Sequence, residues 1–264
     1  AMSQLPVSPR LAHMLIQGKK EGLGPLACYV AALLSERDIA SARRQSDLSL
    51  RFETLRKQAQ GFQFIHKSAQ QLGRHLHIKV SSQSLNVTEW QSELGFLVAL
   101  AYPDRIAQHR TGEAPRFLLS GGRGALLPES DGLANADYLA VADLDGHPRE
   151  AKIYLAARLS SEQLEKLTGE QQYTDIEIDT RKAKVRIYET ENYGALTLKR
   201  TLIRQPDPAQ LQTALCQMIR TQGIHKLPWE NAQRQWLARL AFAHRQDPEY
   251  WPLITMEDLN ADIH

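Results

Sequence analysis

Arginine and lysine side chains form the strongest chemical pattern in this sequence, and their cationic groups are suited to pairing with phosphate. Residues 37–79 contain nine Lys/Arg and three Asp/Glu. Arg44 lies seven residues before Arg51, so both are expected on one helix face, opposite the apolar stripe. Lys67 and Arg74 have the same spacing. We interpret these faces as a phosphate track, and the open alternative is an ordinary solvated helix surface.

A second group of basic residues surrounds the first predicted strands. Its members are Arg105, Arg110, Arg116 and Arg123. The glycines at positions 121, 122 and 124 have two possible explanations. They would let a strand backbone approach close to a guanidinium group, or they simply form a hairpin. Aromatic residues make up only 7% of the chain, and most fall in apolar stripes. The pattern therefore favours contact with a nucleic-acid backbone over base stacking.

Motifs for other chemistry are absent or lack their context. Residues 18–20 (Gly-Lys-Lys) lack the upstream glycine and the hydroxyl of a phosphate-binding loop. Residues 22–27 match a dinucleotide fingerprint in letters only, because no strand precedes them and Pro25 lies inside. His75 and His77 have no carboxylate or thiol placed to complete a metal shell. There is no Gly-x-Ser-x-Gly elbow, so we expect neither a catalytic nor a metal site.

The positive charge is concentrated in the first third of the chain. The 264 residues carry a net charge of +2, which by itself indicates little. Residues 1–95 hold 12 Lys/Arg and 7 Asp/Glu, a net charge of +5. Residues 96–205 hold 15 Lys/Arg and 16 Asp/Glu, a net charge of −1. Residues 206–264 hold 5 Lys/Arg and 7 Asp/Glu, a net charge of −2. This distribution is typical of a partial nucleic-acid footprint.

Hydrophobic periodicity predicts an α+β fold in three regions. Residues 9–101 contain five segments with apolar residues at helical spacing, and we assign residues 1–95 to a ratchet-like helical bundle. Residues 96–205 contain five to seven short strands and one short helix, which predict a small β-barrel of the oligonucleotide-binding (OB) type. In residues 151–159, apolar residues at odd positions alternate with Lys152, Tyr154 and Arg158, so one face of this strand is expected to be buried. Residues 206–264 return to helical spacing, and Trp236 is expected on the inward face of the second helix there.

The chain has no marks of secretion or of a membrane protein. Cys28 and Cys216 fall in apolar helical patterns, so we expect buried free thiols in a reducing compartment, and therefore a cytoplasmic protein. No window approaches 18 consecutive apolar residues, so no membrane partner is expected. Ala1 before Met2, and a very short helix predicted after Thr255, lead us to expect a piece of a longer protein.

Several segments together carry a family resemblance. They are Leu5–Leu15, Ala27–Asp38, Tyr102–Ala107, Gly122–Leu126, Tyr138–Leu144, Leu227–Trp229 and Gln233–Phe242. In order and spacing they resemble the helicase-associated, C-terminal region of bacterial DEAH-type RNA helicases, and the resemblance covers nearly the whole chain. In that family a similar Pro-led helix opens a helical ratchet bundle, and an OB fold follows it.

The resemblance implies an accessory role without catalysis of its own. The intact parent would be an ATP-dependent helicase whose two RecA-like motor domains precede this region and bind ATP and Mg²⁺, so no cofactor is expected in this chain. Bundle and barrel would pack on those motor domains and guide single-stranded nucleic acid, expected to be RNA. The alternative is a docking platform that regulates the same helicase through protein contacts, which the near-zero net charge of residues 96–205 also suits.

Overall fold

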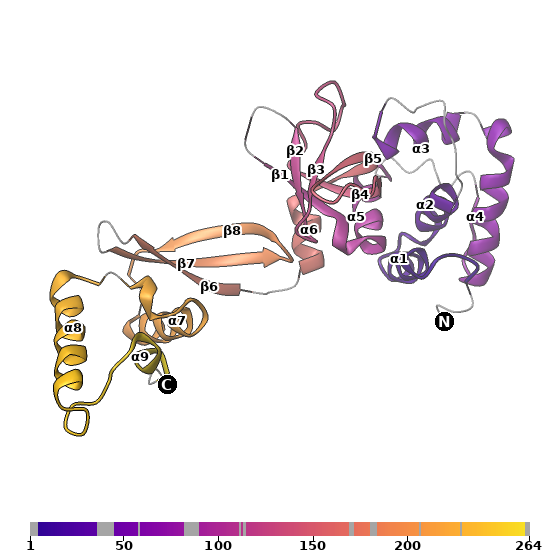
Figure 1. Cartoon of the computed structure of the whole chain (residues 1–264). Helices are drawn as coiled ribbons and strands as arrows, with labels where there is room; N and C mark the ends of the chain where they lie inside the picture. Colours follow the sequence, from indigo (N-terminus) through magenta and orange to yellow (C-terminus); the bar gives the residue numbers. More distant parts are fainter. Residues whose placement is uncertain are drawn as a thin grey trace. The chain divides into compact units, whose positions relative to one another are not determined.

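The computed structural model separates into two compact units, which are described one by one (Figure 1). It describes residues 5–35, 45–57, 59–81, 90–110, 112, 115–168, 172–179, 184–205, 207–227 and 229–261. The first unit comprises residues 1–169 together with Tyr193–Leu196. The second unit comprises residues 170–192 and 197–264. The predicted α+β fold is confirmed, since helices precede and follow a small closed barrel.

The first unit begins with a helical bundle. Its elements are α1 (Pro9–Lys20), α2 (Gly24–Ser35), α3 (Leu48–Lys57), the 3₁₀ turn η3 (Ala59–Phe62), α4 (Gln63–His75) and α5 (Trp90–Ala101). α2 is buried almost all round, because it packs against α1, α4 and α5. The Tyr29 ring of α2 meets Phe52 edge-on at 6.5 Å, and its hydroxyl lies 3.0 Å from His66 Nδ1. An apolar helix at the centre thus holds amphipathic helices around it.

The barrel follows the bundle directly and contains five strands. They are β1 (Ile106–His109), β2 (Arg116–Leu119), β3 (Gly124–Leu126), β4 (Tyr138–Leu144) and β5 (Glu150–Leu159). The strand order is β1-β2-β3-β5-β4, and pairing of β1 with β4 closes the barrel. β3 and β5 run parallel, whereas the other pairs are antiparallel. The 3₁₀ turn η5 (Pro103–Arg105) links α5 to β1.

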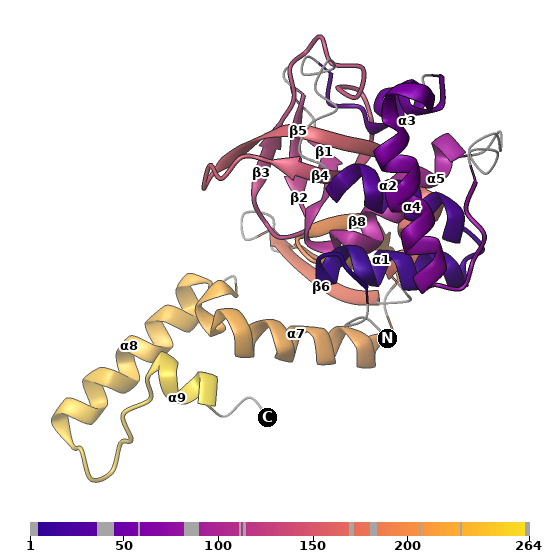
Figure 2. The ribbon, with the colours of Figure 1, turned by 90° about the vertical axis from the view of Figure 1, so that its right-hand side faces the viewer.

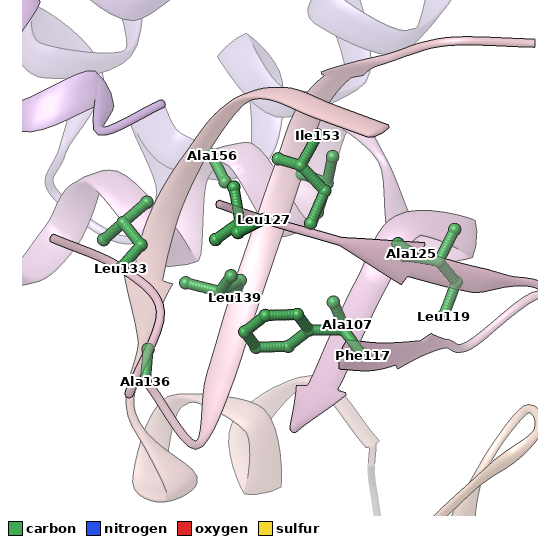
Figure 3. Close-up of a cluster of buried hydrophobic side chains, with 11 residues drawn as sticks. Ala107, Phe117, Leu119, Ala125, Leu127, Leu133, Ala136, Leu139, Ile153 and Ala156 are labelled. Atoms are coloured by element: carbon green, nitrogen blue, oxygen red, sulfur yellow. The ribbon is translucent and has the colours of Figure 1, made fainter. Parts of the chain in front are cut away.

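Apolar side chains fill the interior of the barrel (Figure 3). Phe117, Leu139 and Ile153 lie among them, each at most 1% exposed. The alternation predicted for residues 151–159 holds from Ala151 to Leu155 and then breaks, because Ala156 is buried as well and lies in the barrel core. A filled interior leaves only the outer surface and the loops of the barrel for binding a ligand.

α5 connects the bundle to the barrel, and Figure 1 shows it between the other bundle helices and the strands. The contact depends on Gly95, because a Cβ atom at this position would overlap the carbonyl oxygen of Arg158 in β5. The absence of a side chain at Gly95 therefore lets α5 lie directly on the barrel wall.

The barrel is shorter in sequence than predicted. It closes with β5 at Leu159, so the strands expected up to Leu202 are not part of it. The short helix after Ser160, α6 (Ser161–Thr168), follows the fifth strand instead of lying within the strand series. The physical reason is the pairing of β1 with β4, which leaves no free edge for later strands to join.

Those later strands form a separate three-stranded sheet. They are β6 (Gln172–Asp179), β7 (Lys184–Tyr193) and β8 (Leu196–Ile203), in the order β6-β7-β8. The tight turn between β7 and β8 belongs to the first unit, where the Ala195 amide donates to the Ser120 carbonyl at 2.9 Å. Gly194 in this turn has a φ of +57°, in the left-handed region that glycine favours.

Helices complete the second unit. They are α7 (Pro208–Gln222), the 3₁₀ turn η6 (Ile224–Lys226), α8 (Asn231–Gln246) and α9 (Met256–Ala261). α7 packs on β6, and α9 packs on η6. The expectation that Trp236 points inward is wrong, since its side chain is 53% exposed. Cys216 is half-buried instead of buried, whereas Cys28 is buried and burial raises the pKa of its thiol to about 12. Within the described part of the chain, no helix combines the length and apolar character needed to span a membrane.

Candidate nucleic-acid interface

Lys67 and Arg74 lie on the solvent side of α4, as their spacing predicts. Both are exposed, whereas Ile65 and Leu72 of the same helix are buried. Residues 59–81 contain no Asp or Glu, so no carboxylate within this segment neutralises the two cations. This surface, Lys67 and Arg74 on α4, is called the α4 face below. It presents positive charge to solvent with little opposing charge nearby in sequence.

The other predicted pair of the bundle has a different environment. Arg51 lies on α3, where its side chain is half-buried and already interacts within the protein. Arg44 lies outside the residues that the structure describes. Of the four predicted cations of the bundle, the structure thus describes Lys67 and Arg74 as exposed and Arg51 as half-buried.

An exposed aromatic ring accompanies the α4 face. Phe64 is 47% exposed and precedes Lys67 by three residues, so the two side chains are neighbours on the helix surface. The sequence pattern places most aromatic residues in apolar stripes, so this exposed ring was not predicted. The signal was present, because Phe64 falls outside the stripe that Phe62, Ile65 and Ala69 form.

Arg105 is engaged inside the first unit. Its guanidinium lies over the Tyr102 ring at 4.9 Å, and its Nη1 donates to the Ala142 carbonyl at 3.0 Å. Arg10 of α1 reaches the same ring at 5.4 Å and pairs with Asp104 at 2.5 Å. Arg105 thus connects the start of β1 to β4. Its guanidinium is already engaged in contacts within the protein.

Arg110 and Arg116 come together where β1 and β2 separate. The Arg110 amide donates to the Arg116 carbonyl at 2.7 Å, and both side chains are exposed. Arg116 Nε lies 3.5 Å from Glu150 Oε1. An exposed ion pair of this kind contributes between 0 and about 1 kcal/mol. Phosphate could therefore replace Glu150 as the partner of Arg116 at small cost.

Arg123 lies at the opposite end of β2, in the turn before β3, and is half-buried. The amides of His147 and Lys152 donate to Asp145 and lower the pKa of its carboxyl, and the charge of Arg123 adds to this effect. Arg123 therefore lies near enough to the loop between β4 and β5 to influence Asp145. Of the two explanations for the glycines, the hairpin is the one found, since Gly122 has a φ of +86° and β2 pairs with β3.

Two functional candidates on β5 were not among the predicted site residues. Lys152 is exposed, and its Nζ lies 5.7 Å from the centroid of the Tyr154 ring, which is 46% exposed. The strand register pairs Arg116 with Leu126 and Leu126 with Lys152, so the two cations flank one residue on the outer wall. Arg116, Lys152 and Tyr154 are called the barrel face below. The alternation of residues 151–159 was the signal that placed Lys152 and Tyr154 outward.

The described residues offer exposed surfaces that are suited to binding. Within the described ranges, no group of three or more His, Cys, Asp or Glu side chains lies close enough to hold a metal ion. The α4 face and the barrel face each combine exposed cations with an exposed aromatic ring. Such an arrangement can pair with phosphates and stack on bases without reading their sequence.

Comparison with known proteins finds similarity to a curated protein and to solved structures. No family model matches the chain. The chain is 29% identical over 267 residues to the ATP-dependent RNA helicase HrpB of Escherichia coli (strain K12). The match covers 99% of this chain and 31% of HrpB, so the chain spans about a third of the length of this curated relative.

Two of the similar solved structures are crystal structures of the same protein. A crystal structure of the E. coli DExH-box NTPase HrpB has a TM-score of 0.68 at 28% identity, covering 98% of this chain and 31% of that one. A crystal structure of the Escherichia coli DEAH/RHA helicase HrpB has a TM-score of 0.65 at 27% identity with the same coverage. The chain resembles part of HrpB. The predicted resemblance to a bacterial DEAH-type helicase is therefore confirmed over nearly the whole chain.

Proposed function

We propose that this chain is the accessory region of an HrpB-like ATP-dependent RNA helicase and that it guides single-stranded RNA in the cytoplasm. The observation that carries the proposal is the barrel face, in which Arg116, Lys152 and Tyr154 occupy the outer wall of a filled barrel in a chain similar to HrpB. RNA would cross this wall and the α4 face. Contact would go chiefly to phosphates, so binding would be weak, tolerant of sequence and steeply dependent on salt.

The barrel topology supports this role. The closed barrel of five strands, in the order β1-β2-β3-β5-β4 with β3 and β5 parallel, supports the assignment to the OB type. OB barrels bind oligonucleotides on the face of their second and third strands and on the neighbouring loops. Arg116 begins β2, and Arg110 and Arg123 lie in the loops at its two ends. The predicted barrel arginines other than Arg105 therefore lie on or beside the surface that such barrels use.

Catalysis would belong to other parts of the full-length protein. The sequence has no phosphate-binding loop of the form Gly-x4-Gly-Lys-Ser/Thr, which supports placing ATP and Mg²⁺ outside this chain. We place both in RecA-like motor domains against which this region would pack. ATP turnover by the purified chain would contradict this assignment.

The test is the fluorescence anisotropy of a labelled 20-nucleotide oligouridylate, titrated with the full 264-residue chain at several salt concentrations. The variant Arg116→Glu with Lys152→Glu should weaken binding at least ten-fold at low salt, because two phosphate contacts become repulsive. Lys166→Glu with Arg204→Glu, at two exposed positions outside both faces, changes the net charge equally and is the matched control, which should lose far less. Equal losses in both variants would show only an effect of net charge and would contradict the barrel face.

The docking platform remains the competing function. If the chain binds no RNA at low salt, the proposed strand contact is wrong and the exposed surfaces are better assigned to protein partners. Binding to separately purified motor domains, measured by calorimetry, would then decide whether this region regulates the helicase through protein contacts.

A further inference from the structure

One ridge of α8 alternates exposed aromatic and arginine side chains. Trp236, Arg239, Phe242 and Arg245 follow one another at intervals of three residues. Residues three apart on a helix are neighbours, with about 5–6 Å between their Cβ atoms. All four are exposed, and the exposed fractions of Trp236 and Phe242 are 53% and 63%. These four residues are called the α8 ridge.

The packing of α8 does not use this ridge. Leu237, Leu240 and Ala241 are half-buried and lie on the opposite side of the helix. Figures 1 and 2 both show one long side of α8 facing away from α7 and α9. A large aromatic side chain exposed on a solvent-facing side is costly to keep unless it meets a partner. Two such rings on one ridge therefore mark an interaction surface.

The charges on α8 specify an anionic partner. The helix contains three arginines and neither Asp nor Glu. Arg234 donates to the Trp229 carbonyl at 3.3 Å, whereas Arg239 and Arg245 form no hydrogen bond or ion pair with the part of the chain that the structure describes. Asp247 follows the helix directly, and its carboxylate accepts the Tyr250 amide at 3.2 Å.

We propose that the α8 ridge is a second binding site for single-stranded nucleic acid, separate from the barrel face. Bases would stack on Trp236 and Phe242, and phosphates would pair with Arg239 and Arg245. The proposal rests on the proposed function only in taking single-stranded RNA as the ligand. A helix rises about 1.5 Å per residue, so the two rings lie about 9 Å apart along the axis with Arg239 between them. Each ring therefore receives a different base.

The ridge does not have the pattern of a docking site for a protein helix. Such a site needs a continuous apolar stripe at positions i, i+3, i+4 and i+7. Here an arginine follows each aromatic residue at i+3. The i+4 neighbour of Trp236 is the apolar Leu240, but that of Phe242 is the polar Gln246, so no apolar stripe continues along the ridge. Alternating rings and guanidinium groups match the alternating bases and phosphates of a single strand better than they match an apolar helix.

The test compares two ridge variants of the full chain in anisotropy titrations with labelled 20-nucleotide oligouridylate. Trp236→Ala with Phe242→Ala should weaken binding about five-fold or more for each ring. Arg239→Gln with Arg245→Gln should lower the slope of log affinity against log salt by up to about 1.4, since a contact to a single strand contributes about 0.7. Tyr250→Ala is the matched control, because this ring is 74% exposed but lies off the ridge.

Tryptophan fluorescence provides a readout that a general loss of charge or stability would not reproduce. Oligouridylate should quench the emission of Trp236, and Trp236→Phe should remove this quenching while affinity stays within about two-fold, because phenylalanine still stacks. Unchanged affinity in both ridge variants, with quenching that persists in Trp236→Phe, would overturn the site.

The barrel variant separates this inference from the proposed function. If Arg116→Glu with Lys152→Glu weakens binding but neither ridge variant does, the α8 ridge is wrong and the proposed function stands. If the ridge variants weaken binding but the barrel variant does not, the ridge stands and the barrel face is wrong. If the α8 ridge binds a protein instead of RNA, both ridge variants should bind RNA with unchanged affinity.

Discussion

The amide nitrogen of Ser46 lies 2.9 Å from a carboxylate oxygen of Asp131, 85 residues further along the chain. Both residues are buried, and the second Asp131 oxygen accepts the Leu133 amide at 2.9 Å. Ser46 also joins β5 directly, because its carbonyl accepts the Ala156 amide at 2.8 Å. The segment that leads into α3 is therefore hydrogen-bonded to the barrel and the loop before β4. Bundle and barrel behave as one unit for this reason.

Asp131→Asn should lower the free energy of unfolding by about 1–3 kcal/mol. An amide retains one acceptor oxygen, so its NH₂ group would face one of the two buried backbone amides and leave it unpaired. Urea denaturation followed by circular dichroism measures the change. Asp137→Asn, at an exposed position of the same loop, is the control and should change the unfolding free energy by less than about 0.5 kcal/mol.

Gly95→Ala should destabilise the first unit more strongly. A methyl group at this position overlaps the Arg158 carbonyl oxygen, so α5 would have to move away from β5. Overpacking typically costs about 1–3 kcal/mol, and a clash with backbone lies at or above the upper end of this range. Thermal unfolding of Gly61→Ala provides the comparison, because a Cβ at Gly61 has no heavy atom within 4 Å. Equal melting temperatures for the two variants would contradict the close contact.

Stability should fall as the pH decreases through about 6.5, in part because of His66. Burial lowers the pKa of His66 below its ordinary value of 6.5, so the unfolded chain binds its proton first. The stabilisation is then fully present above the unfolded pKa and decreases below it, until the folded pKa is reached. The His66→Gln variant should show a shallower loss between pH 7 and pH 5 in urea titrations. An identical pH profile in both proteins would show that His66 does not contribute.

Lys67→Gln with Arg74→Gln should flatten the salt dependence of RNA binding. Each phosphate contact to a single strand contributes about 0.7 to the slope, so two lost contacts reduce it by up to about 1.4. Arg105→Gln is the informative control, since this guanidinium is engaged with Tyr102 and the Ala142 carbonyl. We expect Arg105→Gln to lower the melting temperature and to leave the salt slope unchanged. If Arg105→Gln lowers the salt slope and the double variant does not, then Arg105 contacts RNA and the α4 face is an ordinary solvated surface.

Elements with strong periodicity could be predicted from the sequence alone. Apolar spacing placed α1 to α5, α7 and α8 within a few residues of their observed positions. The alternation of residues 151–159 gave the inward and outward faces of β5, including Lys152 and Tyr154. Periodicity succeeds here because each element must bury one face, and the spacing of its own residues defines that face.

The extent of the barrel and the use of its arginines were decided only by tertiary structure. Barrel closure depends on the pairing between β1 and β4. The sequence of each strand does not by itself specify which other strand it pairs with. Arg105 and Arg123 look alike in the sequence, but one lies over Tyr102 and the other lies near enough to Asp145 to influence it. Whether a cation is free for a ligand depends on neighbours that are distant in sequence.

The exposure of aromatic residues shows the same division. The sequence determined that α8 is a helix with an apolar side formed by Leu237, Leu240 and Ala241. The sequence could not determine how much of the helix surface is covered by the rest of the unit. Trp236 lies just outside the covered part. A local pattern specifies the direction of each side chain, whereas burial depends on what other elements pack there. Tertiary packing therefore decided which aromatic rings remain available to a partner.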